Sequence, residues 1–264
     1  TPAHARQLVA DSPLLGADAV TEIRESAFPT ATVDVTYDPD DDLETAVERV
    51  RREAAEAVES GAEILVLSDR SAGPDRLPVP SLLATSAVHH HLVREGLRAR
   101  TGLVVESGEP RTTHHVAALV GYGAGAVNPY LAVETVTDLV GSPEGMSAAD
   151  VAETYLGALE TGLLKIMAKM GISTVESYQG AQIFETVGLN SAVVDEYFAG
   201  TENRTEGIGL AEIEADLRER HAAAYAEDPD LEIQGEFSNR QNGRHHQWNP
   251  QTVNTLQRAV RSGE

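Results

Sequence analysis

The fold is decided between residues 63 and 106, which read EILVLSDRSAGPDRLPVPSLLATSAVHHHLVREGLRARTGLVVE. Apolar runs at 64–67 and 103–105 predict two buried strands. Between them we expect a helix from about Ser81 to Glu95, which Gly96 ends because glycine readily adopts the left-handed backbone of a helix C-terminus. A strand, a helix and a second strand in this order are typical of a parallel sheet covered by helices.

The same alternation continues on both sides of this unit. We expect further strands at 32–37, 126–127 and 172–175, and helices at 40–61, 112–120, 130–140, 147–171, 179–187 and 191–198. These make about five strand–helix units, too few for a complete eight-stranded barrel. The sequence therefore predicts an α/β fold with a partial or modified (β/α) barrel-like parallel sheet under helix cover, or else an open doubly wound sheet.

The domain organisation is predicted as one domain over residues 1–264. Its α/β core covers about 30–200. After Gly200 the composition changes to a charged amphipathic helix, a polar turn-rich stretch and a last helix that Pro250 begins, so 201–264 is expected as a helical and polar C-terminal segment.

The chain is strongly acidic, with 42 Asp and Glu against 20 Lys and Arg and a formal net charge of −22. Lys165 and Lys169 are its only lysines. This balance disfavours nucleic acid and anionic lipid as partners, because phosphate binding needs clustered basic side chains. Many carboxylates, few lysines and few aromatic residues predict a protein of a salt-rich cytoplasm; the alternative is an acidic protein with a basic partner.

The absence of cysteine from the 264 residues excludes disulfides, thiolate nucleophiles and cysteine-ligated iron–sulfur clusters in this chain. No apolar run approaches the roughly 20 residues of a membrane-spanning helix. The chain starts without Met and without a signal-like apolar stretch, and we interpret it as a piece of a longer protein.

Polar side chains follow the predicted strands at their carboxyl ends, where α/β proteins gather functional groups. The candidates are Ser68, Asp69, Arg70, Glu106, Arg111, Asn128 and Tyr178. Their convergence would form a polar pocket or a channel mouth. In the alternative interpretation Asp69 is a cap and Glu106 pairs with Arg111 only to hold the layers together.

The histidines occur in runs, and none of these runs contains the i,i+4 pair of a helical zinc site. His114 and His115 are therefore interpreted as capping or inter-domain hydrogen-bonding groups rather than metal ligands. Lys165 and Lys169 are spaced to share one helix face, and we expect them to pair with carboxylates of a neighbouring domain. No P-loop and no nucleophile elbow occur.

Five long motifs carry a family resemblance. They are EILVLSDR (63–70), LPVPSLLATSAVHHHLVREGLR (77–98), VVESGEPRTTHHVAALVGYGAGAVNPYLAVET (104–135), GLLKIMAKMGISTVESYQGAQIFETVGLN (162–190) and GRHHQWNPQTVNTLQRAV (243–260). In this order they resemble the central domain of the glutamate synthase large subunit, from about Ser12 to Ser262.

The resemblance implies a role between two catalytic domains. In that family a glutaminase domain releases ammonia, which passes through an internal tunnel to an FMN-bearing barrel and reacts there with 2-oxoglutarate; an iron–sulfur cluster delivers electrons. The central domain connects the two and is related to FMN-linked TIM barrels. The implied partners are thus the glutaminase and FMN domains of the same protein, with the electron donor left open.

The resemblance also implies that this chain is non-catalytic. It would hold no catalytic, cofactor or metal residues of its own, and the candidates above, with His114, His115, Lys165 and Lys169, would be tunnel or inter-domain contacts. Two alternatives remain open from the residues: a free-standing flavin- or phosphate-binding barrel enzyme, and a regulatory binding module.

Overall fold

The structure, a computed structural model, describes residues 7–140, 146–229, 235 and 238–263. Residues up to 221 form one compact unit, and those from 222 onward form another. The strands are β1 (Thr30–Asp34), β2 (Thr36–Tyr37), β3 (Ile64–Ser68), β4 (Leu77–Pro78), β5 (Gly102–Glu106), β6 (Ala126–Asn128), β7 (Glu185–Thr186) and β8 (Glu202–Asn203). The helices are α1 (Ala17–Glu25), α2 (Leu43–Glu59), α3 (Ser81–Arg94), the 3-10 turn η2 (Arg98–Arg100), α4 (Thr113–Gly121), α5 (Tyr130–Val140), α6 (Ala148–Met170), α7 (Val175–Tyr178), α8 (Ser191–Tyr197), α9 (Leu210–Ala224) and α10 (Pro250–Ser262).

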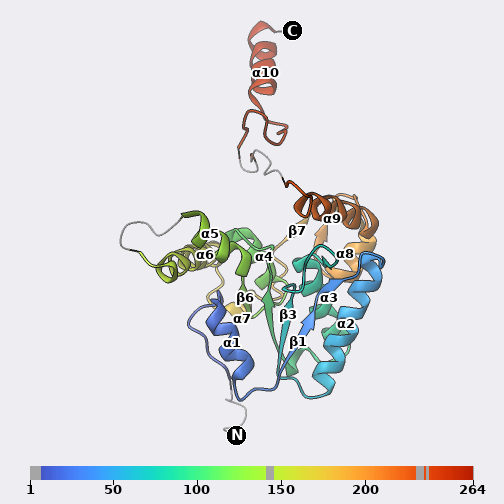
Figure 1. Cartoon of the computed structure of the whole chain (residues 1–264). Coiled ribbons are helices and arrows are strands. Elements are labelled where there is room, and N and C mark those ends of the chain that lie inside the picture. The colour runs from blue at the N-terminus through green and yellow to red at the C-terminus, as the bar shows by residue number, and fades with distance from the viewer. Residues whose placement is uncertain (1–6, 141–145, 230–234, 236–237, 264) are drawn as a thin grey trace. The chain divides into compact units, whose positions relative to one another are not determined.

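The central sheet of the first unit has four parallel strands in the order β1-β3-β5-β6 (Figure 1). Strand order follows chain order with no reversal. A doubly wound sheet reverses its order at a switch point, whereas the strands of a (β/α) barrel follow one another in sequence. The predicted partial barrel-like sheet with helix cover is confirmed, and the doubly wound alternative is wrong.

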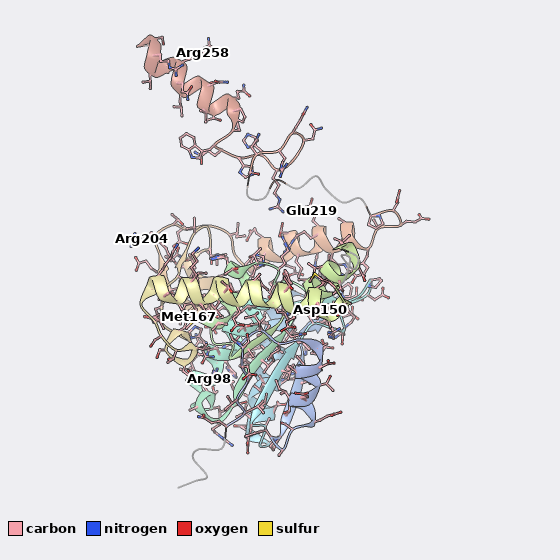
Figure 2. All side chains as sticks on the ribbon, turned by 90° about the vertical axis from the view of Figure 1, so that its left-hand side faces the viewer. Arg98, Asp150, Met167, Arg204, Glu219 and Arg258 are labelled. Atoms are coloured by element: carbon pink, nitrogen blue, oxygen red, sulfur yellow. The ribbon has the colours of Figure 1, made fainter. Side chains whose placement is uncertain are left out.

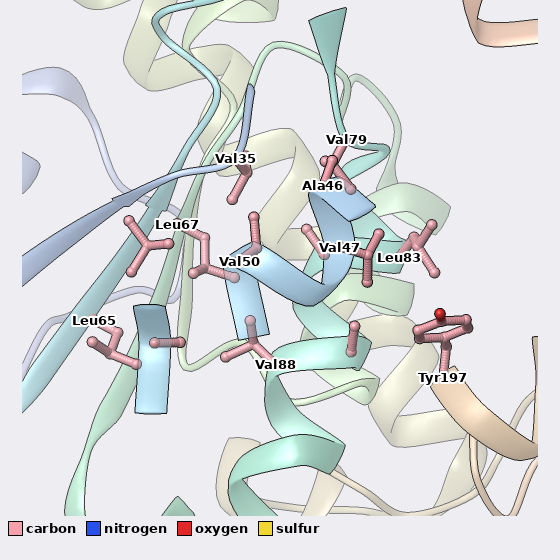
Figure 3. Packing of buried hydrophobic residues seen from close by; sticks show 14 of the residues in the cluster. Val35, Ala46, Val47, Val50, Leu65, Leu67, Val79, Leu83, Val88 and Tyr197 are labelled. Atoms are coloured by element: carbon pink, nitrogen blue, oxygen red, sulfur yellow. The ribbon is translucent and has the colours of Figure 1, made fainter. Parts of the chain in front are cut away.

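Side chains of the central strand β3 alternate between two cores, because successive residues of a strand point to opposite faces. On β3, Leu65 and Leu67 join the cluster formed with α2 and α3, while Ile64 and Val66 join a second cluster with α1. Figure 3 shows the first cluster, with Val50 of α2 packed between the sheet and α3. Both faces of the sheet are thus covered, as the continuous apolar runs predicted.

Helix α6 packs against α4 through Leu159, Leu163 and Met167. The two helices approach closely, since a Cβ on Gly162 would overlap the side chain of Thr113. The ends of α6 follow the sequence signals: Ser147 forms a capping box, and Gly171 adopts a left-handed φ of 73° after the last residue.

Two local predictions are wrong. The strand-like segment 172–175 does not form a fifth strand, because the Thr174 side chain accepts a hydrogen bond from the Ser177 backbone and begins α7. The helix expected at 179–187 is also not formed: Gly180 and Gln182 have φ values of 68° and 53°, which a right-handed helix does not allow, and β7 follows.

The core extends beyond residue 200. Leu217 of α9 is buried in the cluster around α2 and α3, and Ile213 packs against it. In the second unit, α10 begins at Pro250 as expected but has no buried residue. None of the described helices is long and apolar enough to cross a bilayer.

Candidate functional site

The carboxyl ends of the four central strands carry a row of polar residues in register. Asp34 pairs with Ser68, Ser68 with Glu106, and Glu106 with Asn128, across three adjacent strand pairs. Parallel strands end at a common edge, so their last residues meet there. The structure therefore brings Ser68, Glu106 and Asn128 together, as the sequence predicted, and adds Asp34 to the row.

Glu106 is the centre of this edge and is only 2% exposed. Its carboxylate accepts hydrogen bonds from Ser68 Oγ at 2.6 Å, Arg24 Nη2 at 2.6 Å and Arg70 Nε at 3.0 Å. Burial raises the pKa of Glu106, but the hydrogen bonds from Arg24, Ser68 and Arg70 outweigh that effect and hold it below its ordinary value. The carboxylate is thus ionised and neutralised by two guanidinium groups.

Arg70 links the loop after β3 to α5. Its guanidinium carbon lies 4.0 Å from the ring centroid of Tyr130, and Nη1 lies 3.3 Å from Glu134 Oε1. Burial lowers the pKa of Arg70, but Glu106 and Glu134 raise it by more, so the guanidinium stays charged. A cation over an aromatic face, with a carboxylate on either side, fixes the orientation of this long side chain.

Asp69 holds the loop after β5. Its carboxylate accepts hydrogen bonds from Ser107 Oγ at 2.5 Å and from the Gly108 amide at 3.0 Å, and it bonds to the Tyr130 side chain. Burial raises the pKa of Asp69, and these bonds offset the effect only in part. Asp69 thereby ties the loops after β3 and β5 to the first residue of α5.

Asn128 closes the row on β6. Its Nδ2 donates to the carbonyl oxygen of Leu15 at 2.7 Å, which anchors the segment before α1. Its Oδ1 is buried without a hydrogen-bond partner in the part of the chain that the structure describes.

Arg111, His114 and His115 lie at the start of α4. The Arg111 amide donates to His115 Nδ1 at 3.2 Å, and Tyr155 of α6 donates to the Arg111 carbonyl at 2.9 Å. The His114 ring meets Phe184 edge-on, with centroids 6.1 Å apart. These residues connect α4 to its neighbours. The predicted pairing of Glu106 with Arg111 is wrong, because Glu106 pairs with Arg24 and Arg70 instead.

Tyr178 does not join the edge. It is buried against α4 and α6, and its neighbour Gln179 donates to the Ala124 carbonyl oxygen at 2.8 Å. Ala124 precedes β6, so Gln179 is at the end of the sheet opposite to Glu106. The expectation that Tyr178 converges with the other candidates is wrong because the segment before it is not a strand.

Lys165 and Lys169 do not lie at the edge of the sheet, because both are exposed on α6.

Sequence reasoning missed Arg24, Tyr130 and Glu134. Arg24 comes from α1, a short helix that was not predicted although Val20 and Ile23 share its buried face, and it is 82 residues from Glu106. Tyr130 and Glu134 had a usable signal, since they are spaced i,i+4 on a helix that begins two residues after Asn128.

The charged side chains of this edge are engaged with one another. Among the described residues no group of three or more His, Asp and Glu side chains is placed to hold a metal ion. Arg24 and Arg70 both pair with Glu106, and Arg76 pairs with Asp34. What this arrangement can do is hold α1, the loops after β3 and β5, and α5 in fixed positions.

Comparisons with known proteins agree with the sequence resemblance. The family model described as "Glutamate synthase central domain" matches residues 1–190. The chain is 39% identical to the glutamate synthase [NADPH] large chain of Bacillus subtilis, over 99% of this chain and 17% of that protein. It is 38% identical to ferredoxin-dependent glutamate synthase 2 of Synechocystis, over 97% of this chain and 18% of the relative. The chain thus spans less than a fifth of the length of these relatives.

Among solved structures, the chain is similar to a flavocytochrome b2 mutant with pyruvate bound, at 16% identity and a TM-score of 0.41, over 74% of this chain and 44% of that one. It is also similar to DHODH of Eimeria tenella in complex with ferulenol, at 16% identity and a TM-score of 0.38, over 58% of this chain and 38% of that one. The family assignment rests on the sequence match instead. Because the family model covers more than half of its residues, the chain belongs to the glutamate synthase central domain family.

Proposed function

We propose that this chain is the connecting domain of a glutamate synthase. In the whole protein, glutamine and 2-oxoglutarate would yield two glutamates by reductive transfer of the amide nitrogen. The chain would set the distance between a glutaminase domain and an FMN synthase domain of the same polypeptide and help to enclose the path of ammonia. FMN and an iron–sulfur cluster would belong to the rest of that protein, which acts in the cytoplasm.

The observation that carries the proposal is the way Glu106 is neutralised. A general base needs a free oxygen and a pKa near the working pH. Glu106 has its pKa below the ordinary value and accepts from three side chains, so it fits a fixed structural charge. In (β/α) barrels the catalytic loops follow the carboxyl ends of the strands. At the same edge of this chain, Arg24 and Arg70 are held by Glu106.

A path for ammonia requires walls that keep out water and acids, because protonation to ammonium removes the nucleophilic lone pair. A rigid edge supports that role. Arg70 is held by Glu106, Glu134 and Tyr130 together, which leaves its charge little freedom to move. The candidate tunnel or inter-domain contacts are Ser68, Asp69, Arg70, Glu106, Arg111, His114, His115, Asn128, Tyr178, Lys165 and Lys169.

The electron donor is not indicated by this chain. Relatives named for NADPH, NADH and ferredoxin match it at 39%, 37% and 38% identity. Since these identities are alike, the residues present here do not separate the three donors.

The test compares two rates in the intact parent enzyme. Arg70→Met and Glu106→Gln should leave glutamine hydrolysis in place and reduce glutamate formation from glutamine, because ammonia is lost on the way. Glutamate formation from added ammonium should be affected less. Arg52→Met is the matched control, since Arg52 is an exposed arginine paired with Glu56 across one helical turn.

An unchanged ratio of glutamine hydrolysed to glutamate formed in both variants would remove the proposed role. Binding of added FMN by this chain alone, with a yellow chromophore, would favour a free-standing flavin enzyme. A ligand that shifts the thermal midpoint of the isolated chain would favour a regulatory binding module.

A further inference from the structure

One face of α6 is left open by the fold. The helix is held on its other side, where Leu159, Leu163 and Met167 are buried against α4. The exposed residues of three successive turns are Gly157, Ala158, Thr161, Leu164, Lys165, Ala168 and Lys169, and we call this set the α6 outer face. Figure 2 shows the helix running across the view between Asp150 and Met167.

The geometry of this face suits contact with another surface. Positions 157, 161, 164 and 168 fall on one line along the helix, by the i,i+4,i+7 spacing of a single stripe. Leu164 is 55% exposed in the middle of that stripe, whose other members, Gly157, Thr161 and Ala168, are small. Small side chains let a second backbone approach closely, and an exposed leucine gives apolar area to bury.

The charge of the face is opposite to that of the chain. The seven residues of the α6 outer face include no carboxylate and both of the lysines, and the nearest acidic residues of the helix, Glu153 and the half-buried Glu160, border the stripe on the side away from the lysines. Neither lysine forms an ion pair with any residue that the structure describes. The positive charge therefore has no partner within the described part of the first unit.

Local helix stability does not account for the pair. Like charges at i,i+4 destabilise a helix slightly. Lys169 is in the last turn, where the helix dipole favours a cation, but Lys165 is one turn earlier and gains little from it. Two lysines with no ion-pair partner among the described residues are better explained by an external partner.

We propose that the α6 outer face docks onto a carboxylate-bearing surface of the same polypeptide outside residues 1–264. Leu164 would fill an apolar depression, and Lys165 and Lys169 would pair with Asp or Glu side chains at its rim. Charge complementarity selects this partner chemistry. The same polypeptide is the expected source of this surface, because more than four-fifths of the length of the relatives lies outside the matched region. This inference rests on the proposed function, because it assumes that the parent is the multidomain enzyme.

Zero-length cross-linking in the intact parent enzyme tests it. A carbodiimide joins an amine to a carboxylate only when the two are in contact, and arginines do not react, so the amine side chains of this chain that can be joined are Lys165 and Lys169. An equal mixture of nitrogen-15-labelled and unlabelled enzyme separates links within one polypeptide from links between copies. We expect these lysines to be joined to Asp or Glu outside residues 1–264. Both peptides of each cross-linked pair should be labelled, or both unlabelled.

Variants sharpen the result. Lys165→Glu with Lys169→Glu should raise the reactivity of the facing carboxylates towards a small added amine, whereas Lys165→Arg with Lys169→Arg should not. Arg52→Glu with Arg204→Glu makes the same charge change at exposed positions outside α6 and should leave that reactivity as it is.

Links only within residues 1–264, links only between copies, or no links from these lysines would each overturn the proposal. The ratio of glutamine hydrolysis to glutamate formation, measured in the same samples, separates the two ideas. Suppose that the lysines are linked to other domains while the Arg70 and Glu106 variants keep the wild-type ratio of glutamine hydrolysed to glutamate formed. That result would support the docking face and reject the proposed role of Arg70 and Glu106 in retaining ammonia.

Discussion

Arg24 Nη2 lies 2.6 Å from Glu106 Oε2, and this bond joins a helix that precedes the sheet to the end of its third strand in chain order. Arg70 reaches the other oxygen of the same carboxylate. One buried carboxylate therefore holds two arginines from different parts of the chain. The loss of stability when one arginine is removed then depends on whether the other is still present.

The first prediction is that Arg24 and Arg70 are energetically coupled. Each single change to Met should lower the free energy of unfolding by about 1–2 kcal/mol, below the 3–5 kcal/mol of a fully buried pair because both arginines are over a third exposed. The double variant should lose more than the sum, by roughly 0.5–3 kcal/mol, since Glu106 is then buried with no cation. Urea unfolding of the four proteins measures this.

Arg52→Met is the control, because an exposed i,i+4 pair contributes at most about 0.5 kcal/mol. Strict additivity of Arg24→Met and Arg70→Met would show that the two cations act independently.

The second prediction concerns acid. Burial, followed by the nearby charge of Arg98, lowers the pKa of His89 to about 4. The folded protein therefore holds His89 neutral while the unfolded chain takes up a proton near pH 6.5. This stabilisation is complete above about pH 6.5 and is lost as the pH falls towards 4, with a slope of at most about 1.4 kcal/mol per pH unit.

The measurement is urea unfolding of wild type and His89→Gln at pH 7 and pH 5. Wild type should lose about 1–2 kcal/mol more than the variant over this interval. His245→Gln, in an exposed position of the second unit, should behave like wild type. Equal pH dependence of His89→Gln and wild type would contradict the buried, neutral state of His89.

These residues show how far sequence alone reached. The apolar runs at 64–67 and 103–105 predicted strands correctly because a strand buried on both faces needs continuous apolar residues. The start of α6 near residue 147 was also predicted, because the Ser147 cap and its partner Asp150 are only three residues apart. Ser68, Glu106 and Asn128 were found because parallel strands end at one edge.

What sequence could not supply were contacts without a local pattern. Arg24 meets Glu106 across 82 residues of chain, and only the packed fold brings them together. Tyr178 was misplaced because Ile172 and Thr174 favour a strand by type, while the Thr174 side chain caps a helix instead. Local hydrogen bonding outweighed residue preference there.

The third prediction uses two glycines with similar backbones and different surroundings. Gly123 and Gly61 have φ values of 116° and 105°, and a Cβ on Gly123 would overlap the His89 ring whereas one on Gly61 would meet nothing within 4 Å. Both changes to Ala should cost about 1–2 kcal/mol for the backbone conformation. Gly123→Ala should cost roughly a further 1–3 kcal/mol for the overlap.

Thermal or urea unfolding of the two variants gives the difference directly. His89→Ala combined with Gly123→Ala should recover part of the extra loss, because the ring is then absent. Equal losses at the two glycines would show that the His89 ring moves aside freely.

The last prediction concerns salt, where two effects of opposite sign compete. Exposed ion pairs such as Arg52–Glu56 weaken as salt rises, but each contributes at most about 0.5 kcal/mol. The 20 cations can neutralise at most 20 of the 42 carboxylates, which leaves 22 whose mutual repulsion salt relieves. At 1 M salt the Debye length falls to about 3 Å, so repulsion between neighbouring carboxylates is largely removed. The free energy of unfolding should therefore rise from 0.2 to 3 M KCl, and sorbitol at equal osmolality should give a smaller rise. A flat or falling stability would show that ion pairs outweigh repulsion and would reject adaptation to a salt-rich cytoplasm.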